Sequence, residues 1–344
     1  MARILVTGGS GFIGSAVVDA LVTAGHRVRV LDQAEPARPN AGAEYLKADL
    51  RDHDAVRAAV RGVDAVSHQA AKVGLEAGMA DAVDYASTND VGTAVLLAAL
   101  DEAGFGSGGS GRLVLASSMV VYGEGRYRCV EHAVVRPPPR AAERLAAGDF
   151  DPTCPRCGGA LVAEPVTEDA VTDPRNVYAA TKLHQEHLCA VFGWQRGVAV
   201  TALRYHNVYG PGMPRDNPYS GVAAIFASSL RSGEAPRVFE DGRQRRDFVH
   251  ASDVARANLL ALTCEPPVEG PVNVATGFPR SVGGLAAALA DAFGPGAPQP
   301  VITGGYRLGD VRHVFASPTR AEELMGFRAE VDLHEGMREL AASL

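Results

Sequence analysis

The chain has 344 residues, of which 47% are hydrophobic and 21% are charged, a composition that excludes a disordered protein. At about 150 residues per domain, this length favours two domains or one two-lobed unit. The net charge of −7 argues against nucleic acid as a partner, because phosphate binding needs a basic face. The sequence has neither an apolar run of about 18 residues nor a signal peptide, so we expect no membrane partner and a cytoplasmic location.

The first half alternates short apolar strands with longer helical patterns, which predicts an α/β fold with a doubly wound parallel sheet. We expect strands at Arg3–Thr7, Arg27–Leu31, Glu44–Lys47, Ala65–His68, Arg112–Ser117 and Ala199–Leu203. Helical patterns begin near Phe12 and near Asp54, and two longer ones cover Asp81–Ala103 and Val177–Phe192.

The second half has a less regular pattern. Its helical segments are expected at Val222–Arg231, Ser252–Leu262, Val282–Phe293 and His334–Ala342. We therefore expect residues 1–203 to form a Rossmann-like sheet domain. Residues 204–344 should form mainly a smaller mixed α/β lobe that covers it, with some segments returning to the first domain.

A glycine-rich loop follows the first predicted strand. Gly8, Gly11 and Gly14 stand three residues apart, and a helical pattern begins within the loop. Glycine permits a tight turn and lets backbone N–H groups approach a pyrophosphate at the helix N-terminus. A glycine pattern alone could be an ordinary turn, but this strand–loop–helix context predicts a dinucleotide-binding loop.

Asp32, after the second predicted strand, bears on the choice of dinucleotide. A carboxylate there can accept hydrogen bonds from ribose hydroxyls and repels a 2′-phosphate, which favours NAD over NADP. The alternative is a solvated aspartate at a strand end. Asp49 and Leu50, after the third strand, give a weaker signal for contact with the adenine.

Tyr178 and Lys182 are four residues apart at the start of a predicted helix, so their side chains share one face. A nearby lysine stabilises a phenolate, and we expect it to lower the tyrosine pKa from about 10 toward neutrality. Such a tyrosine can take the proton of a substrate hydroxyl. A surface Tyr–Lys pair is the alternative, but the glycine loop and Ser118 at a strand end favour the catalytic interpretation.

These residues carry a resemblance that covers nearly the whole chain apart from one insertion. The chain resembles the extended short-chain dehydrogenase/reductases, and more narrowly the nucleotide-sugar epimerases and dehydratases, in Thr7-Gly8, His68-Gln69-Ala70-Ala71, Asn89, Ser118, Tyr178, Lys182 and Arg246–His250. The resemblance implies that Tyr178 is the base, that Ser118 orients a sugar hydroxyl, and that Lys182 also holds the nicotinamide ribose. It further implies that Asn89 supports the active-site geometry, and that a homodimer forms through the two long helices.

The resemblance extends to the second half. Asn207 matches an asparagine that meets the substrate pyrophosphate, and Arg246 and Arg307 match arginines that clamp the nucleotide diphosphate with their planar forks. His206 stands where phenylalanine is usual, and contact with the substrate and a packing role are the two alternatives for it. The candidate substrate site comprises Lys72, Ser118, Met119, Asn207, Arg246, Arg307 and Asp310. The candidate cofactor site comprises Gly8, Gly11, Phe12, Ile13, Gly14, Asp32, Asp49, Leu50, Ala70, Lys72, Asn89, Tyr178 and Lys182.

Met119 and Val120 distinguish among the reactions of the resembled group. The 4,6-dehydratases have an Asp-Glu pair at these places, and decarboxylating members keep a glutamate at the second. Both positions are apolar here, which favours NAD-dependent epimerisation of a nucleotide-diphosphate sugar at C4 through a 4-keto intermediate. Another NAD-dependent nucleotide-sugar oxidoreductase, a UDP-sugar 4-epimerase and a non-catalytic dinucleotide sensor are the alternatives.

Residues 124–173 form a Pro- and Arg-rich insertion that holds three of the five cysteines. The pairs Cys129-x-x-His132 and Cys154-x-x-Cys157 have the spacing of a tetrahedral, structural zinc site. Free thiols and a disulfide are the alternatives. A cysteine-bearing segment at this place resembles that of a bacterial group described as dTDP-L-rhamnose 4-epimerases. We expect this segment to lie beside the mouth of the active site.

Overall fold

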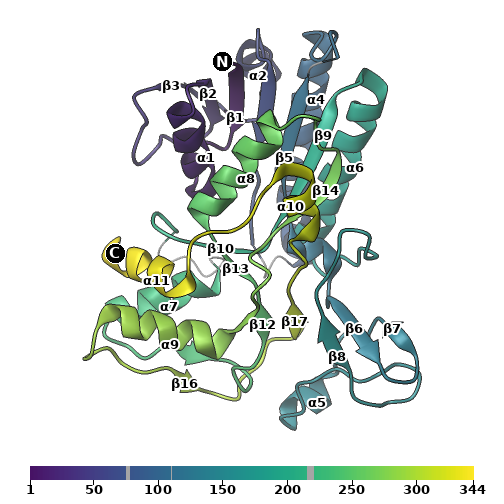
Figure 1. Ribbon diagram of the computed structural model, residues 1–344, viewed down its shortest axis with the longest axis vertical. Helices are drawn as coiled ribbons and strands as arrows, with labels where there is room; N and C mark the ends of the chain where they lie inside the picture. The colour runs from purple at the N-terminus through teal and green to yellow at the C-terminus, as the bar shows by residue number, and fades with distance from the viewer. Residues whose placement is uncertain (75–77, 110, 215–220) are drawn as a thin grey trace.

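The apolar strands of the sequence fold into one parallel sheet in a computed structural model that describes residues 1–74, 78–109, 111–214 and 221–344 (Figure 1). The sheet has seven strands in the order β14-β9-β5-β4-β1-β2-β3, which confirms the predicted Rossmann-like sheet. Its strands are β1 (Arg3–Thr7), β2 (Arg27–Asp32), β3 (Ala43–Lys47), β4 (Ala65–His68), β5 (Arg112–Ser118), β9 (Ala199–Tyr205) and β14 (Gly270–Val274).

Helices cover both faces of this sheet, because successive side chains of each strand enter two different cores. Ile4 and Val6 of β1 lie in one core, and Leu5 lies in the other. The first face carries α1 (Phe12–Thr23), α8 (Ala251–Thr263) and α10 (Thr319–Met325). The second carries α2 (His53–Ala59), α4 (Gly92–Glu102) and α6 (Val177–Arg196). In the described part of the chain, no helix combines the length and apolar character needed to pass through a bilayer.

The long helix predicted over Asp81–Ala103 is not uniform. The chain forms a 3₁₀ turn (η1, Met79–Asp81), α3 (Ala82–Tyr85), a π-helical turn (η2, Ala86–Val91) and α4. The π turn contains Asn89, whose side chain is fully buried and bonded to neighbouring segments. A regular helix is therefore wrong here, and π turns of this kind are frequent at functional sites.

The second half contributes to both parts of the molecule. The helices α8 and α10 and the strand β14 complete the sheet domain, while the rest forms a smaller lobe around α7 (Val222–Arg231), α9 (Val282–Phe293) and α11 (Leu333–Ala342) (Figure 1). Its short strands are β10 (Asn207–Tyr209), β11 (Arg237–Val238), β12 (Arg245–Arg246), β13 (Phe248–His250), β15 (Arg280–Ser281), β16 (Val301–Ile302) and β17 (His313–Val314). Strands of two or three residues show no periodic pattern, so the sequence does not predict them.

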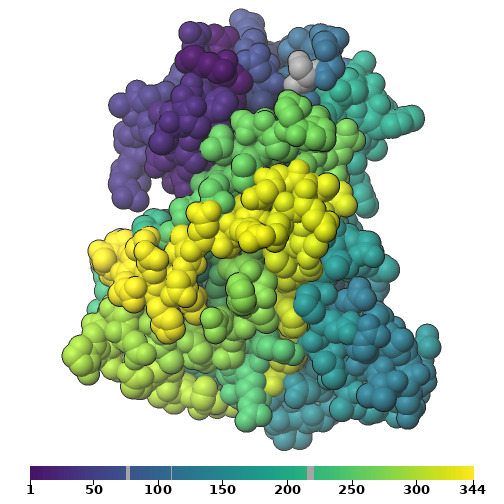
Figure 2. Space-filling model, in the orientation of Figure 1, coloured from purple at the N-terminus to yellow at the C-terminus, as the bar shows by residue number. Residues whose placement is uncertain are grey.

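Residues 124–173 fold outside the main sheet. They form an antiparallel sheet in the order β7-β6-β8 and one short helix, with β6 at Arg126–Cys129, β7 at Ala133–Val135, α5 at Ala142–Ala146 and β8 at Val162–Glu164. The His313 backbone N–H of β17 donates to the Tyr127 hydroxyl of β6 at 3.1 Å. The insertion therefore lies directly against the smaller lobe, as the space-filling view in Figure 2 also shows.

Candidate active site

The glycine loop joins β1 to α1 at the carboxyl ends of the parallel strands. Gly8 has a left-handed backbone with φ +70°, and a Cβ there would lie 2.6 Å from the backbone nitrogen of Ala70. A Cβ on Gly14 would lie 2.1 Å from the Gly8 carbonyl oxygen. Only glycine fits these two positions, so the loop presents bare backbone at the helix N-terminus, where a phosphate binds favourably.

This loop lies at the switch point of the sheet. The strands β1 and β4 are neighbours, but the helices that follow them cover opposite faces, which opens a crevice at their carboxyl ends. Asp32, at the end of β2, accepts hydrogen bonds from the Ser10 N–H at 3.0 Å and the Ala34 N–H at 2.9 Å. These contacts hold the carboxylate beside the loop, and its remaining lone pairs can accept ribose hydroxyls.

The other predicted cofactor residues lie along the same edge of the sheet. Phe12 and Ile13 are the first residues of α1, directly after the glycine loop. Asp49 and Leu50 follow β3, at the outer end of the sheet, and Asp49 pairs with Arg51 at 2.6 Å. Asp49 is therefore engaged with a neighbouring side chain in this structure.

Ser118, Tyr178 and Lys182 come together where β5 ends and α6 begins. The Asn176 side chain caps α6 by accepting a backbone N–H of the first turn at 2.7 Å, which fixes Tyr178 in that turn. The Tyr178 phenol forms a hydrogen bond with the side chain of Ser118. One turn later, the Lys182 ammonium donates to the Ala116 carbonyl of β5 at 2.8 Å.

The protein groups by themselves do not lower the pKa of Tyr178. Burial raises the pKa of this phenol, and the hydrogen bond with Ser118 acts in the opposite direction. Lys182 is also buried, and burial lowers its pKa to about 8. The expectation that Lys182 lowers the Tyr178 pKa is therefore wrong for the chain alone, because desolvation outweighs the favourable interactions.

Asn89 uses its whole amide group on the protein. Its Oδ1 accepts the Lys72 N–H at 2.7 Å, and its Nδ2 donates to the Lys72 carbonyl at 3.1 Å and the Thr181 hydroxyl at 2.9 Å. The Lys72 ammonium lies 5.1 Å from the centre of the Tyr85 ring. Asn89 thus ties the segment after β4 to α6, the helix that carries Tyr178 and Lys182, in the manner of a positioning residue.

A buried ion pair that the sequence does not predict lies next to the predicted catalytic residues. Glu186, one turn beyond Lys182 on α6, accepts two hydrogen bonds from Arg204 of β9, at 2.9 and 2.7 Å. The same carboxylate accepts the hydroxyl of Ser117, the residue before Ser118. The pair joins β9 to α6, and the Ser117 hydroxyl adds the end of β5. The spacing of four residues between Lys182 and Glu186 is the signal that could have indicated it.

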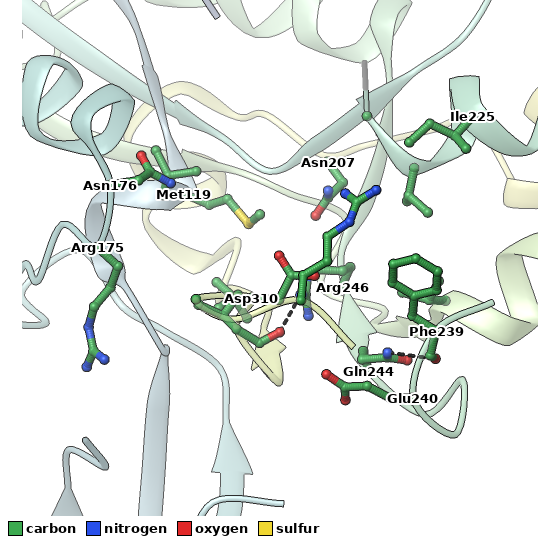
Figure 3. A pocket seen from close by; sticks show the side chains of 18 of the residues that line it. Met119, Arg175, Asn176, Asn207, Ile225, Phe239, Glu240, Gln244, Arg246 and Asp310 are labelled. Atoms are coloured by element: carbon green, nitrogen blue, oxygen red, sulfur yellow. Dashed lines mark hydrogen bonds between the residues drawn. The ribbon is translucent and has the colours of Figure 1, made fainter. Parts of the chain in front are cut away.

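A cleft of about 960 Å³ opens between the start of α6 and the smaller lobe (Figure 3). Five of the seven predicted substrate residues line it, namely Met119, Asn207, Arg246, Arg307 and Asp310. Lys72 and Ser118 are not among the lining residues. The buried Oδ1 of Asn207 has no hydrogen-bond partner within the described ranges, so it is available to a ligand.

Arg246 is bonded to the protein rather than left free in the cleft. Its guanidinium donates to the carbonyls of Arg245, Val311 and Arg312 at 2.8, 2.5 and 2.9 Å. Burial lowers its pKa. The side chain therefore braces the loop that carries Asp310 and brings a positive charge to the cleft wall.

His206 packs inside the protein. His206 is 4% exposed and does not line the cleft, although Asn207 beside it does. Burial lowers the pKa of His206 to about 3, so the ring is neutral at ordinary pH. These observations favour the interpretation of His206 as a packing residue.

Comparison with known proteins identifies the family of this chain. The chain matches the NAD dependent epimerase/dehydratase family over residues 4–143 and 156–275. The chain belongs to this family. It is 32% identical over 349 residues to the dTDP-L-rhamnose 4-epimerase of Burkholderia thailandensis, and the match covers 98% of this chain and 93% of the relative.

Two solved structures of the family are similar over nearly their whole length. The UDP-glucose 4-epimerase of Thermotoga maritima with UDP-glucose gives a TM-score of 0.80 at 28% identity, covering 99% of this chain and 98% of that one. The UDP-glucose 4-epimerase of Thermus thermophilus in complex with NAD gives a TM-score of 0.77 at 31% identity, with the same coverage. The predicted resemblance to the nucleotide-sugar epimerases is confirmed.

The family match is interrupted over residues 144–155, inside the insertion. In this insertion, four possible metal ligands lie together, with ligand atoms all within 4.8 Å of one another: Cys129, His132, Cys154 and Cys157. Gly158, with φ +71°, closes the second pair by donating to the Cys154 carbonyl at 2.8 Å. All five cysteines are free, and the Cys129 and Cys157 sulfurs are 3.7 Å apart, so the disulfide alternative is wrong in this structure.

Several further cleft residues lie on loops that carry no motif. Arg175, Phe239, Glu240 and Gln244 all line the cleft, and the sequence does not predict this role for them (Figure 3). Gln244 donates to the Phe239 carbonyl at 2.9 Å. Loop positions show no periodicity, so only their proximity in space connects these residues with the site.

Proposed function

We propose that this protein inverts C4 of the sugar in a nucleoside diphosphate sugar, with NAD as its resident cofactor. The observation that carries the proposal is that Ser118, Tyr178 and Lys182 meet where β5 ends and α6 begins, with the Lys182 ammonium bonded to the Ala116 carbonyl of β5 and Met119, next to Ser118, lining the cleft. Met119 and Val120 line the cleft next to Ser118 and are apolar, so neither can act as the acid or base that removes water. The relatives named as 4-epimerases support this interpretation.

The described residues fit the cofactor. A Cβ on Gly8 or Gly14 would collide with the backbone of Ala70 or of Gly8, so only glycine allows this tight loop, whose backbone N–H groups at the start of α1 would hold the pyrophosphate. Asp32 would accept the hydroxyls of the adenosine ribose. Lys182 would reach the nicotinamide ribose beside Tyr178. Bound NAD would supply the hydride acceptor and donor for C4.

The chain itself moves one proton. Tyr178, as phenolate, takes the proton of the C4 hydroxyl as C4 is oxidised, and Ser118 orients that oxygen by a hydrogen bond. The 4-keto sugar then turns its other face to the cofactor while Asn207 and the arginines of the cleft hold its diphosphate. Tyr178 returns the proton to the C4 oxygen as C4 is reduced, which gives the inverted alcohol and restores the base.

Because the hydride returns in every turnover, no net NADH should accumulate. A panel of dTDP-, UDP- and GDP-sugars, followed by NMR of the C4 epimer and by absorbance of NADH, tests the proposal and identifies the nucleotide. We expect an epimer with at least one sugar and a flat absorbance. A stoichiometric rise in NADH would instead show an NAD-dependent dehydrogenase, and NAD binding without turnover on any sugar would favour a sensor.

Asp32→Ala should weaken NAD binding by roughly 10- to 100-fold, because a hydrogen bond to a charged group contributes about 1.5–3 kcal/mol. The preference for NAD over NADP should narrow, since the carboxylate no longer repels a 2′-phosphate. Titration calorimetry with both cofactors measures the two effects. Asp64→Ala is the control, because Asp64 accepts the Arg3 N–H at the amino ends of the strands, away from the glycine loop. A wild type that prefers NADP would show that Asp32 does not bind the ribose.

We also propose that the four clustered residues of the insertion hold a structural zinc ion. Tetrahedral Zn–S bonds of about 2.3 Å and a Zn–N bond of about 2.0 Å place two sulfurs about 3.8 Å apart, and sulfur and nitrogen about 3.5 Å apart. The Cys129 sulfur lies 3.6 Å from His132 Nδ1 and 3.7 Å from the Cys157 sulfur, and the Cys154 sulfur lies 3.7 Å from His132 Nδ1. Four protein ligands leave no position for water, so this zinc would not take part in the chemistry.

A homodimer is proposed from exposed apolar side chains on adjoining helices. Val83 of α3 and Trp194 of α6 are 82% and 85% exposed, and Val91 and Val191 lie exposed on η2 and α6. These side chains belong to the helices through which the resemblance implies that a dimer forms, and exposed apolar side chains suit such an interface. Light scattering should therefore give twice the chain mass of 35.9 kDa, and Trp194→Glu should shift the protein toward monomer. Phe278→Glu is the control, because it changes an exposed aromatic residue elsewhere and should leave the dimer intact. A monomeric wild type would contradict the proposal.

A further inference from the structure

One arginine of the insertion reaches the wall of the cleft. Arg140 lies between β7 and α5, and its side chain is 4% exposed. Its guanidinium pairs with Glu240 at 2.8 Å and donates to the Asp310 carbonyl at 2.7 Å and to the Phe150 carbonyl at 3.0 Å. Glu240 and Asp310 both line the cleft, on two loops that are far apart in the sequence. A single side chain of the insertion therefore joins two loops of the cleft wall.

Glu240 depends on this contact. It has a left-handed backbone with φ +52° that is unfavourable for a residue with a side chain, and it is 3% exposed. One carboxylate oxygen meets Arg140, and the other meets Arg312 at 2.8 Å. Arg312 is shared, because it also pairs with Asp241 and with Asp151 of the insertion. Loss of Arg140 would leave a buried carboxylate with a partner that two other carboxylates already use.

The wall held in this way is the side of the cleft opposite the chemistry. Met119 and Asn176 adjoin the catalytic residues in the chain and lie at one side, whereas Phe239 and Glu240 lie at the other (Figure 3). The guanidinium of Arg307 lies 5.1 Å from the centre of the Phe239 ring. When C4 of the sugar meets Tyr178, the nucleoside diphosphate extends toward this far wall. There an aromatic ring suits a nucleobase, and guanidinium groups suit phosphates.

We propose that Arg140 is a positioning residue for the nucleotide end of the cleft. It holds the loops of Glu240 and Asp310 together, and so makes the insertion part of the substrate site although it lies outside the sheet domain. The inference rests on the proposed function for the identity of the ligand. Arg140 thereby affects the affinity for the nucleoside diphosphate and does not contact the reacting carbon.

The test compares Arg140→Met and Arg140→Lys with Arg128→Met in the full-length protein. Arg128 is a matched control, because it belongs to the same insertion, pairs with Glu164 and lines no part of the cleft. Calorimetry with UDP, dTDP and NAD, together with kcat and KM, separates binding from chemistry. Hydrogen exchange over residues 237–246 and 304–312 reports the two loops without any ligand.

Arg140→Met should weaken binding of the preferred diphosphate and raise KM by about tenfold or more, with kcat and NAD affinity changed less than about threefold. Exchange in both loops should speed up. Arg140→Lys should recover part of the affinity, because it keeps the charge but loses the fork that reaches two partners. Arg128→Met should match the wild type in all of these measurements.

Unchanged diphosphate affinity or unchanged exchange in Arg140→Met would overturn the inference. Equal losses in NAD affinity, kcat and diphosphate affinity would also overturn it, because they indicate a general loss of structure. If the wild type binds neither UDP nor dTDP, the proposed function itself is contradicted. If the wild type and Arg140→Met bind the diphosphate equally well, only the role of Arg140 is contradicted.

Discussion

Tyr178→Phe should lower the rate of epimerisation by at least about 10²-fold, because a positioned general base contributes roughly 10²–10⁴-fold. The substitution removes only the hydroxyl that meets Ser118. The ring remains, and with it the edge contact to Tyr85, whose ring centre lies 6.3 Å away. NAD affinity should therefore stay close to that of the wild type. Single-turnover NMR on the preferred sugar and calorimetry with NAD measure the two quantities separately.

The pH dependence sharpens this prediction. Only the phenolate accepts the C4 proton, and burial raises the pKa of Tyr178, so the wild-type rate should rise with pH across the neutral range. Tyr178→Phe should lose this dependence together with the rate. Tyr85→Phe is the matched control, since it removes a hydroxyl from the neighbouring ring and should cost less than about tenfold. Turnover at the wild-type rate in Tyr178→Phe would end the mechanism.

The sheet domain was predictable because its strands are buried on both faces. Ile4, Leu5 and Val6 are all at most 1% exposed, so the sequence of β1 is apolar at each of these positions. The glycines at positions 8 and 14 were predictable for a related reason. Each lies where a Cβ would collide with backbone, and a steric requirement of this kind leaves a visible signature in the sequence.

The contacts that shape the site leave no such signature. Arg140 and Glu240 are a hundred residues apart on loops, and Glu186 and Arg204 belong to a helix and a strand with ordinary patterns. Each pair forms only when the fold brings its members together. Arg246 shows the same limit of prediction from sequence. Its motif predicts a phosphate clamp, but in the structure its guanidinium donates to three backbone carbonyls.

Protein purified without a chelator should contain about one zinc ion per chain, and Cys154→Ser should lower this to less than about a tenth. The apolar cluster around the four candidate ligands is small. It consists of Cys129, Cys154 and Val135 with the half-buried Leu161. A large apolar side chain contributes about 1.5–3 kcal/mol when it is fully buried. A structural zinc contributes about 10–16 kcal/mol in small zinc domains, so the metal should stabilise the insertion more than its apolar cluster does.

Loss of the metal should loosen residues 124–173 and weaken nucleotide-sugar binding more than NAD binding. The reason is that Tyr127 and Arg140 join the insertion to β17 and to the cleft wall, whereas the glycine loop lies at the switch point of the separate main sheet. Elemental analysis, limited proteolysis and calorimetry with both ligands measure these effects. Cys264→Ser is the control, because it removes a free thiol outside the insertion. A wild type with less than about a tenth of an equivalent of zinc would contradict the site, and equal losses of sugar and NAD binding in Cys154→Ser would contradict its link to the cleft.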